Sequence, residues 1–312
     1  MSQSQPLQIE NPHYASFGTS RTINSRLWFI NNQELEERTL GYLAKYQLSH
    51  KIELFAYVIS GSHDHPLARF PECNRSAFYR DFNARKAEAV RALVDEFPGG
   101  PLFERRYAAQ ALPLNEDVEK YFFYCALQPV SAGLCERISE YPGYNSFTDA
   151  IYGRARKVKV VDNGRFNAAR RYNLRVSKED YTTTYTLRYK RLPGYEHLSQ
   201  KEYAKLMLKK LEEHRAKIVA AIKAEGRTFL GRERLLAQEP GTAAKNPKKS
   251  KPYSRRPLVL SVCKEAKAQF LEWYFSVYSE YKRAVKKYLA GNLSVKFPPG
   301  TYRPPSAVAV PT

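Results

Sequence analysis

The chain has 312 residues, 43% of them hydrophobic, and a formal net charge of +20 at pH 7. This apolar share is enough for a packed core and excludes disorder throughout, and no apolar run approaches the roughly 18 residues of a membrane span. The start lacks the features of a secretory signal and the four cysteines form no CxxC pair, so we expect a cytoplasmic protein with reduced thiols and no membrane partner.

The first half of the chain alternates between strand and helix patterns. Ile52–Ile59 is short, apolar and rich in β-forming residues, which predicts a buried central strand. The expected elements are a strand within 13–29, a helix capped by Asn32, strands at 52–59 and 63–70, a helix over 75–97, a strand over 102–112 and a helix from its cap Asn115 to about 129. This β-α-β-β-α-β-α order predicts an α+β fold, a ferredoxin-like sandwich with an antiparallel sheet and helices on one face.

The second half carries all of the excess positive charge. Residues 1–150 hold 15 Lys and Arg against 18 Asp and Glu, a balance of −3, whereas the remaining residues have a balance of +23. Tyrosines are interleaved with this charge, which indicates nucleic acid as the partner and a nucleoid-associated location. The alternative is a solubilising extension.

Composition divides the chain into four expected regions. A capping box at Ser199 and Glu202 predicts a helix that ends at Gly226, and a second amphipathic pattern predicts a last helix over about 263–290. The expected regions are a folded catalytic domain over 1–155, a basic helical and aromatic extension over 156–237, a basic linker over 238–256, and a C-terminal helix with a Pro-rich tail over 257–312.

Two histidines, His63 and His65, are the first candidate site residues. Positions i and i+2 of a strand project from the same face, so we expect the two imidazoles to lie side by side. A divalent metal is the usual reason for such a pair. The alternative is a pair of hydrogen-bonded histidines with a structural role.

Tyr124 and Gln128 are separated by four residues on the predicted third helix, so they share one of its faces. In the predicted topology this helix covers the sheet face from which the histidines project. A tyrosine can attack a metal-bound phosphate as a nucleophile and form a covalent phosphotyrosine. Tyr121, one turn earlier, competes for this role, and an aromatic core helix is the structural alternative for the whole segment YFFYCALQP.

These segments together resemble a known family. AYVISGSHDHPLARF, FFYCALQPVSAGL and EYPGYNSF are similar to the HUH single-tyrosine transposases, and most of all to the REP-associated tyrosine transposases, over about residues 14–150. The resemblance implies that His63, His65 and Gln128 bind Mg²⁺ or Mn²⁺ and that Tyr124 is the nucleophile. It also implies a DNA nucleotidyltransferase that cleaves and rejoins single-stranded or hairpin DNA through a 5′-phosphotyrosine during transposition.

The sequence departs from the family pattern around the histidines. The residue between them is normally hydrophobic because it faces the opposite side of the sheet, but here it is Asp64, and an unpaired buried carboxylate would cost several kcal/mol or stay protonated. Pro66 removes a hydrogen-bond donor from a central strand, and Ser62 stands where the family commonly has Asn. A degraded site on a domesticated DNA-binding protein is therefore the alternative function, and a bulge that turns Asp64 toward the metal is a third possibility.

Basic residues near the predicted site are candidate contacts to the DNA backbone. They are Arg105, Arg106, Arg154, Arg156, Lys157 and Lys159. The structural alternative for each one is a solvated surface charge.

A single nucleophile per chain makes a homodimer possible, because two cleavages need two subunits or two successive uses of one. A rolling-circle initiator or relaxase with the same chemistry is a third functional alternative.

Overall fold

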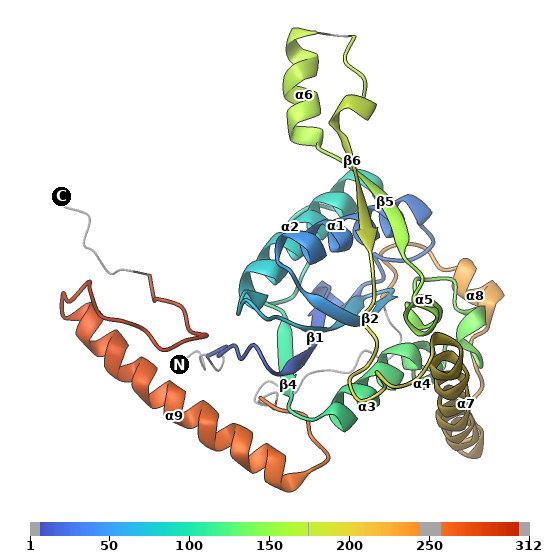
Figure 1. The fold of residues 1–312 in the computed structure, drawn as a ribbon. Coiled ribbons are helices and arrows are strands. Elements are labelled where there is room, and N and C mark those ends of the chain that lie inside the picture. Colours follow the sequence, from blue (N-terminus) through green and yellow to red (C-terminus); the bar gives the residue numbers. More distant parts are fainter. Residues whose placement is uncertain (1–6, 174, 244–256, 306–312) are drawn as a thin grey trace.

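The computed structural model describes residues 7–173, 175–243 and 257–305. Its central sheet has four antiparallel strands in the order β2-β3-β1-β4 (Figure 1). These strands are β1 (Ala15–Arg21), β2 (Glu53–Ser60), β3 (His63–Arg69) and β4 (Ala108–Leu112). The ferredoxin-like α+β fold and the element order predicted from the sequence are confirmed.

Three helices cover the two faces of this sheet. They are α1 (Gln33–Ser49) and α2 (Arg75–Leu93), which pack against each other on one face, and α3 (Asn115–Ala126) on the other. The expectation that all helices lie on one face is therefore wrong. Burial explains the difference, because seven of the eight residues of β2 are buried, and a strand buried on both sides needs cover on both.

Helix ends follow local capping chemistry. The Asn32 side chain accepts the Leu35 N–H at 2.9 Å and begins α1 as predicted. The predicted cap at Asn115 is wrong, because the cap position is Leu114, whose N–H is accepted by the carboxylate of Asp117 at 3.3 Å. Similarly, α2 ends at Leu93 rather than near residue 97, and β4 is shorter than the predicted strand over 102–112.

The strand β2 lies at the edge of the four-stranded sheet, so the prediction that it is central is wrong. Its outer side is nevertheless paired with backbone from later segments. Tyr57 accepts the Ser146 N–H at 3.0 Å, Ile59 donates to the Tyr144 carbonyl at 3.0 Å, and the Lys190 N–H reaches the Leu54 carbonyl at 2.7 Å. This cover hides the edge and explains why the strand has a continuous apolar sequence.

The remaining elements follow in the second half of the chain. They are the short α4 (Gln128–Ser131) and α5 (Phe147–Tyr152), the paired strands β5 (Arg156–Val161) and β6 (Thr182–Leu187) with α6 (Asn163–Tyr172) between them, then α7 (Gln200–Ala224), α8 (Arg232–Leu236) and α9 (Lys264–Leu289), with 3₁₀ turns at Ile23–Ser25, Ile138–Glu140 and Glu179–Tyr181. The predicted capping box of Ser199 and Glu202 begins α7.

The hydrophobic core continues across residue 155. Val160 of β5, Leu187 of β6 and Met207 of α7 are buried in the same cluster as Phe17 of β1 and the aromatic residues of α3. The strands β5 and β6 pack on α1, and α7 packs on α4 and α5. Much of the expected extension over 156–237 is therefore part of the same packed unit as the first half.

The C-terminal helix α9 lies on the side of β4 and of the N-terminal segment (Figure 1). The backbone at 258–260 forms a parallel bridge to β4, with Ala111 donating to Leu258 and accepting from Leu260 at 2.9 Å each. The Tyr274 hydroxyl of α9 donates to the Leu7 carbonyl at 2.9 Å. Residues 244–256 of the expected linker and 306–312 of the tail lie outside the described residues, and none of the described helices is long and apolar enough to cross a membrane.

Candidate active site

The alternation of β3 directs His63 and His65 to the face of the sheet that α3 covers. Their ring centroids are 4.8 Å apart at an interplanar angle of 75°. Asp64, between them, points to the opposite face and meets α2. The expected side-by-side arrangement of the two imidazoles is present, and α3 packs over it through the Cys125 thiol, which lies 3.9 Å from the His65 carbonyl oxygen.

The orientation of His65 follows from Pro66. In β2, the backbone N–H and carbonyl of Tyr57 point away from β3 and bond to Ser146. Its cross-strand partner in β3 is Pro66, whose backbone therefore points away from β2 and toward β1, where it lies opposite Gly18. Proline has no N–H to offer there, which leaves the Gly18 carbonyl free. The Nδ1 of His65 lies 3.0 Å from that carbonyl oxygen and 3.0 Å from the Thr19 hydroxyl oxygen. Because a carbonyl oxygen only accepts, the contact with Gly18 favours the tautomer that carries its proton on Nδ1, and the two contacts together orient the ring.

His63 is oriented by two polar side chains. Its Nε2 accepts from the Gln128 amide at 3.1 Å, and its Nδ1 lies 3.1 Å from the Ser62 hydroxyl oxygen. Burial, together with the charges near it, lowers the pKa of His63 well below its usual value, so the ring is neutral at physiological pH. Gln128 also accepts from Ser60 at 2.7 Å. Since a serine hydroxyl can donate or accept, a half-turn of the amide keeps this bond and turns Oε1 toward the imidazoles.

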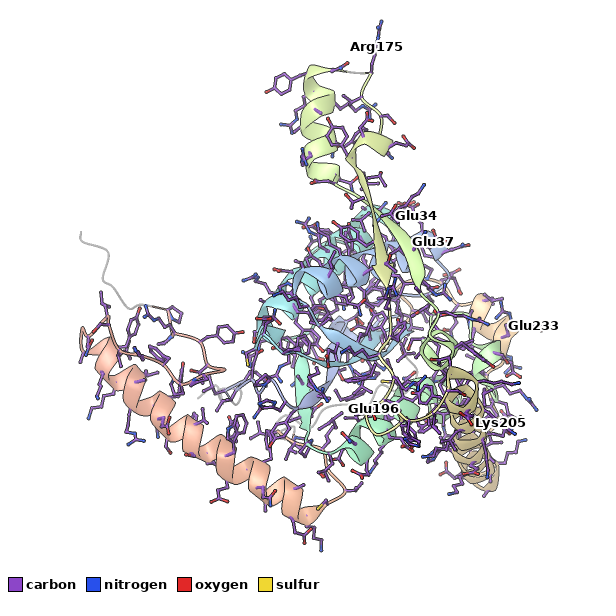
Figure 2. The ribbon with its side chains drawn as sticks, in the orientation of Figure 1. Glu34, Glu37, Arg175, Glu196, Lys205 and Glu233 are labelled. Carbon is purple, nitrogen blue, oxygen red and sulfur yellow. The ribbon has the colours of Figure 1, made fainter. Side chains whose placement is uncertain are left out.

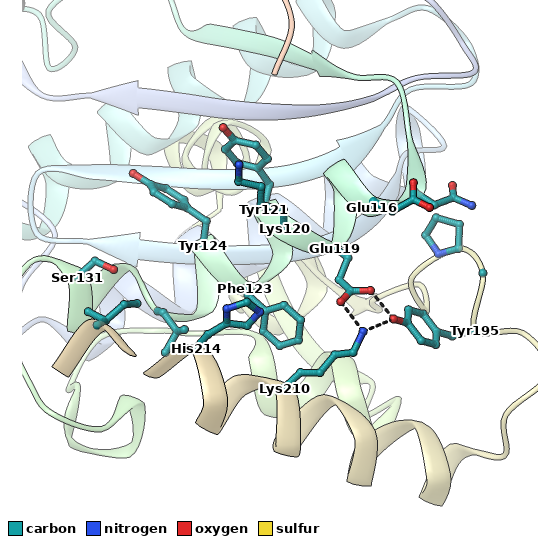
Figure 3. Close-up of a pocket in the computed structure, with 15 residues that line it drawn as sticks. Glu116, Glu119, Lys120, Tyr121, Phe123, Tyr124, Ser131, Tyr195, Lys210 and His214 are labelled. Atoms are coloured by element: carbon teal, nitrogen blue, oxygen red, sulfur yellow. Dashed lines mark hydrogen bonds and ion pairs between the residues drawn. The ribbon is translucent and has the colours of Figure 1, made fainter. Parts of the chain in front are cut away.

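Tyr124 lies beside the histidine pair on the exposed side of α3. Its ring centroid is 6.0 Å from that of His65, and the residue is 46% exposed. Tyr121, its competitor, is less exposed, and its ring lies 5.8 Å from that of Tyr124 at an angle of 48°. Figure 3 shows both hydroxyls directed from α3 toward the sheet. The structure thus brings Tyr124, His63, His65 and Gln128 together, with Gln128 in the short α4 because the helix breaks at Leu127 before a proline.

Phe17 of β1 is a site residue that sequence reasoning missed. Its ring stacks on His65 at 4.7 Å and 25°, and it contacts Tyr121 at 5.0 Å and Tyr124 at 5.4 Å. It therefore fixes the spacing between the imidazole and the two phenols. Odd positions of β1 share this face, but only the strand order reveals that β1 lies next to β3.

Arg21, at the end of β1, is the second residue that was missed. It is paired with His63 across the β1–β3 ladder. Its positive charge opposes the rise that burial causes in the pKa of Tyr124. Its Nε is buried and has no hydrogen-bond partner among the described residues. The positive charge of Arg21, which acts on the phenol, is suited to a site that binds phosphate.

Asp64 is not an unpaired carboxylate, which corrects the sequence expectation. It forms an ion pair with Lys86 of α2, both residues being at most 2% exposed, and accepts the Tyr57 hydroxyl at 2.8 Å. The Lys86 ammonium also lies 4.3 Å from the centre of the Phe82 ring. Burial lowers the pKa of Lys86, and the Asp64 carboxylate opposes this effect. The possible bulge at Asp64 is likewise wrong, because the irregularity of this ladder lies between Leu54 and Ala56 of β2.

The candidate DNA contacts fall into two groups. Arg105 and Arg106 are exposed in the loop before β4, and this loop approaches the site because the Glu104 N–H donates to the Arg21 carbonyl at 3.0 Å. Arg154, Arg156, Lys157 and Lys159 are also exposed, but they lie at and near β5, which packs on α1 in the layer opposite α3. They are therefore not brought to Tyr124.

The second group borders a projecting arm formed by β5, α6 and β6 (156–187), with Arg175 at its outer end (Figure 2). Arg156, at the base of the arm, pairs with the buried carboxylate of Asp149 and lies over the ring of Tyr144. The charge of Arg156 is therefore largely neutralised by contacts within the protein. Within the described residues, no cluster of three or more His, Cys, Asp or Glu suits a metal ion.

Comparison with known proteins gives one solved structure of interest. No known protein family matches this chain, and no curated protein matches it in sequence. The chain is similar to the structure of a REP-associated tyrosine transposase bound to a REP hairpin, with a TM-score of 0.39 and 19% identity. The match covers 47% of this chain and 84% of that chain, and it is a distant likeness of fold.

Proposed function

We propose that the protein is a metal-dependent DNA strand transferase that cleaves and rejoins single-stranded or hairpin DNA through a covalent bond to Tyr124. One observation carries this proposal. Two imidazoles of β3, the amide of Gln128 and the Tyr124 phenol meet on one face of the sheet from segments far apart in the sequence. The net charge of +20 supports a polyanion as substrate.

In the proposed cleavage, the Tyr124 phenol loses its proton to solvent and its oxygen attacks the phosphorus of a phosphodiester. A bond forms from the phenol oxygen to phosphorus, the bond from phosphorus to the 3′ oxygen breaks, and that oxygen takes a proton from water. The 5′ phosphate remains on Tyr124, so another 3′ hydroxyl can attack it, rejoin the strands and release the phenol without ATP. The guanidinium of Arg21 faces the negative charge that grows on the phosphate.

The donor atoms fit a divalent cation. His63 and His65 offer imidazole nitrogens from the same face of β3, and Gln128 offers its amide oxygen after a half-turn. Mn²⁺ accepts such mixed nitrogen and oxygen ligands more readily than Mg²⁺ does. The ion would polarise a non-bridging oxygen of the phosphate as a Lewis acid.

A covalent adduct assay tests the proposal. A 5′- and 3′-labelled hairpin oligonucleotide with single-stranded flanks is incubated with the full chain and Mn²⁺, and protein-linked label is measured on a denaturing gel. We expect an adduct that is lost in Tyr124→Phe and kept in Tyr121→Phe and in Tyr152→Phe, an exposed tyrosine away from the site. An adduct that survives in Tyr124→Phe refutes the assignment of the nucleophile.

The alternative, a DNA-binding protein without catalysis, has the basic second half of the chain in its favour. It predicts that binding survives a chelator and the changes His63→Ala and His65→Ala, with no adduct under any metal. The strand transferase predicts that these changes abolish the adduct and leave binding to phosphates largely intact.

A further inference from the structure

The solvent-facing side of α3 opens into a groove of about 760 Å³ that begins at the two tyrosines of the site. The helix α7 and the loop at 193–195 form its other walls (Figure 3). Tyr121 and Tyr124 lie at one side, and Lys210, His214 and Ile218 of α7 lie at the other. The last three are spaced by four residues, so one stripe of α7 lines the groove.

Five of the fifteen residues that line the groove carry flat rings. Among them, the ring of His214 lies 4.9 Å from that of the buried Phe123, at an angle of 39°. Tyr195 closes the far end with its ring beneath the Lys210 ammonium at 5.2 Å. Such rings are the surfaces on which unpaired bases stack, whatever the sequence.

The charges that line the groove are balanced. Lys210 donates to the Glu119 carboxylate and to the Tyr195 hydroxyl, at 2.6 Å each, and this network fixes α7 to α3. Glu116 and Lys120 add one charge of each sign. The groove therefore neither repels nor strongly attracts phosphate, and its affinity for a ligand comes from its flat walls.

We propose that this groove binds unpaired bases of the DNA strand that stays attached to Tyr124 through its 5′ phosphate. The inference rests on the proposed function, because the phenol that would hold this strand also lines the groove. The Tyr124 residue lines the groove while its hydroxyl points toward the sheet, so a strand bonded to the phenol oxygen would start on the sheet side of the ring and pass over it into the groove. A volume of this size accommodates a mononucleotide or a dinucleotide. The stacked bases hold this end in place until a 3′ hydroxyl arrives to rejoin it.

The test compares two probes with equal charge. The first is a mixed-sequence single strand and the second is an abasic deoxyribose-phosphate chain of the same length, both without a metal and both with full-length Tyr124→Phe, which keeps the ring but cannot react. We expect His214→Ala to weaken binding of the first probe by about 5- to 150-fold and to leave the second unchanged. The salt dependence of binding stays the same because no phosphate contact is removed.

Controls separate the groove from the rest of the surface. His197→Ala removes an exposed histidine outside the groove lining and should change neither probe. His214 is itself exposed, so its replacement leaves the fold intact, and a 5-iodouracil placed just 3′ of the cleaved bond should cross-link to Tyr121 or His214. Equal affinity of the unaltered groove for both probes, or the same loss for both in His214→Ala, overturns the inference.

The outcomes also distinguish this inference from the proposed function. Loss of base-dependent binding in His214→Ala without any adduct in wild type supports the groove and refutes the strand transferase. An adduct that forms at the same rate whether the bases 3′ of the cut are present or abasic supports the strand transferase and refutes the groove.

Discussion

The buried ion pair beneath the histidines gives the sharpest prediction about stability. Asp64 and Lys86 are at most 2% exposed, so removal of either partner leaves a buried charge with no opposite charge. Such a loss costs about 3–5 kcal/mol, a large part of the roughly 5–15 kcal/mol that keeps a protein folded. Among the described residues, Tyr57 is the one other hydrogen-bond donor to the Asp64 carboxylate, and the second carboxylate oxygen, Oδ1, has no partner there.

A double-mutant cycle measures this coupling. All variants carry Tyr57→Phe, because replacement of Asp64 would otherwise leave the buried Tyr57 hydroxyl without an acceptor. In this background Asp64→Val and Lys86→Met should each lower the free energy of unfolding in urea by about 3–5 kcal/mol. The combined variant should come within about 1 kcal/mol of the background, since two apolar residues of similar size then replace the pair.

Two results would contradict this reasoning. Single losses below about 1 kcal/mol, or losses that simply add in the combined variant, would mean that the pair is not coupled.

The same variants decide the role of Asp64 at the site. Because its side chain points away from the histidines, the combined variant should keep both Mn²⁺ binding and the adduct, and a folded variant that loses Mn²⁺ binding would make Asp64 a ligand.

Three further predictions concern neighbouring groups. Burial raises the pKa of Tyr124 and the charge of Arg21 lowers it, so adduct formation should increase with pH, and Arg21→Gln should move this increase to higher pH in a pH–rate profile. Gly18→Ala would place a Cβ 1.6 Å from the Tyr79 hydroxyl oxygen and should destabilise the fold by roughly 1–3 kcal/mol in urea, with partial rescue by Tyr79→Phe. Burial raises the pKa of the Cys125 thiol, so a thiol reagent at pH 8 should modify it only after unfolding.

Periodicity was sufficient to predict the sheet face of the site. The alternation of a strand places His63 and His65 on one side and Asp64 on the other. The spacing of Tyr124 and Gln128 predicts that both lie on one helix face, and in the structure both contact the histidines. These are local properties of a regular backbone. The order of elements then allowed the ferredoxin-like topology to be predicted, because few topologies satisfy it.

Residues brought in by other strands were beyond such reasoning. Arg21 and Phe17 belong to β1, and nothing in their own segment indicates that β3 is the neighbouring strand. The two long helices of the second half, α7 and α9, were predicted, but α6, α8 and the packing of α7 against the layer that carries Tyr124 were not. Contacts between elements depend on the whole set of apolar faces, which a local pattern does not contain.

Asp64 and Pro66, two of the departures from the family pattern, show the same limit of local sequence patterns more clearly. In the sequence, Asp64 and Pro66 indicated a degraded site only because each residue was compared with the residue type expected at its own position. The partner that neutralises Asp64 is Lys86, one helix later, and the group that uses the backbone gap at Pro66 is the neighbouring His65, through the carbonyl of Gly18. Since the charge of Asp64 is paired and the missing backbone donor is replaced by the Nδ1 of His65, neither residue argues for a degraded site. The choice between catalysis and binding alone therefore depends on the chemistry of Tyr124.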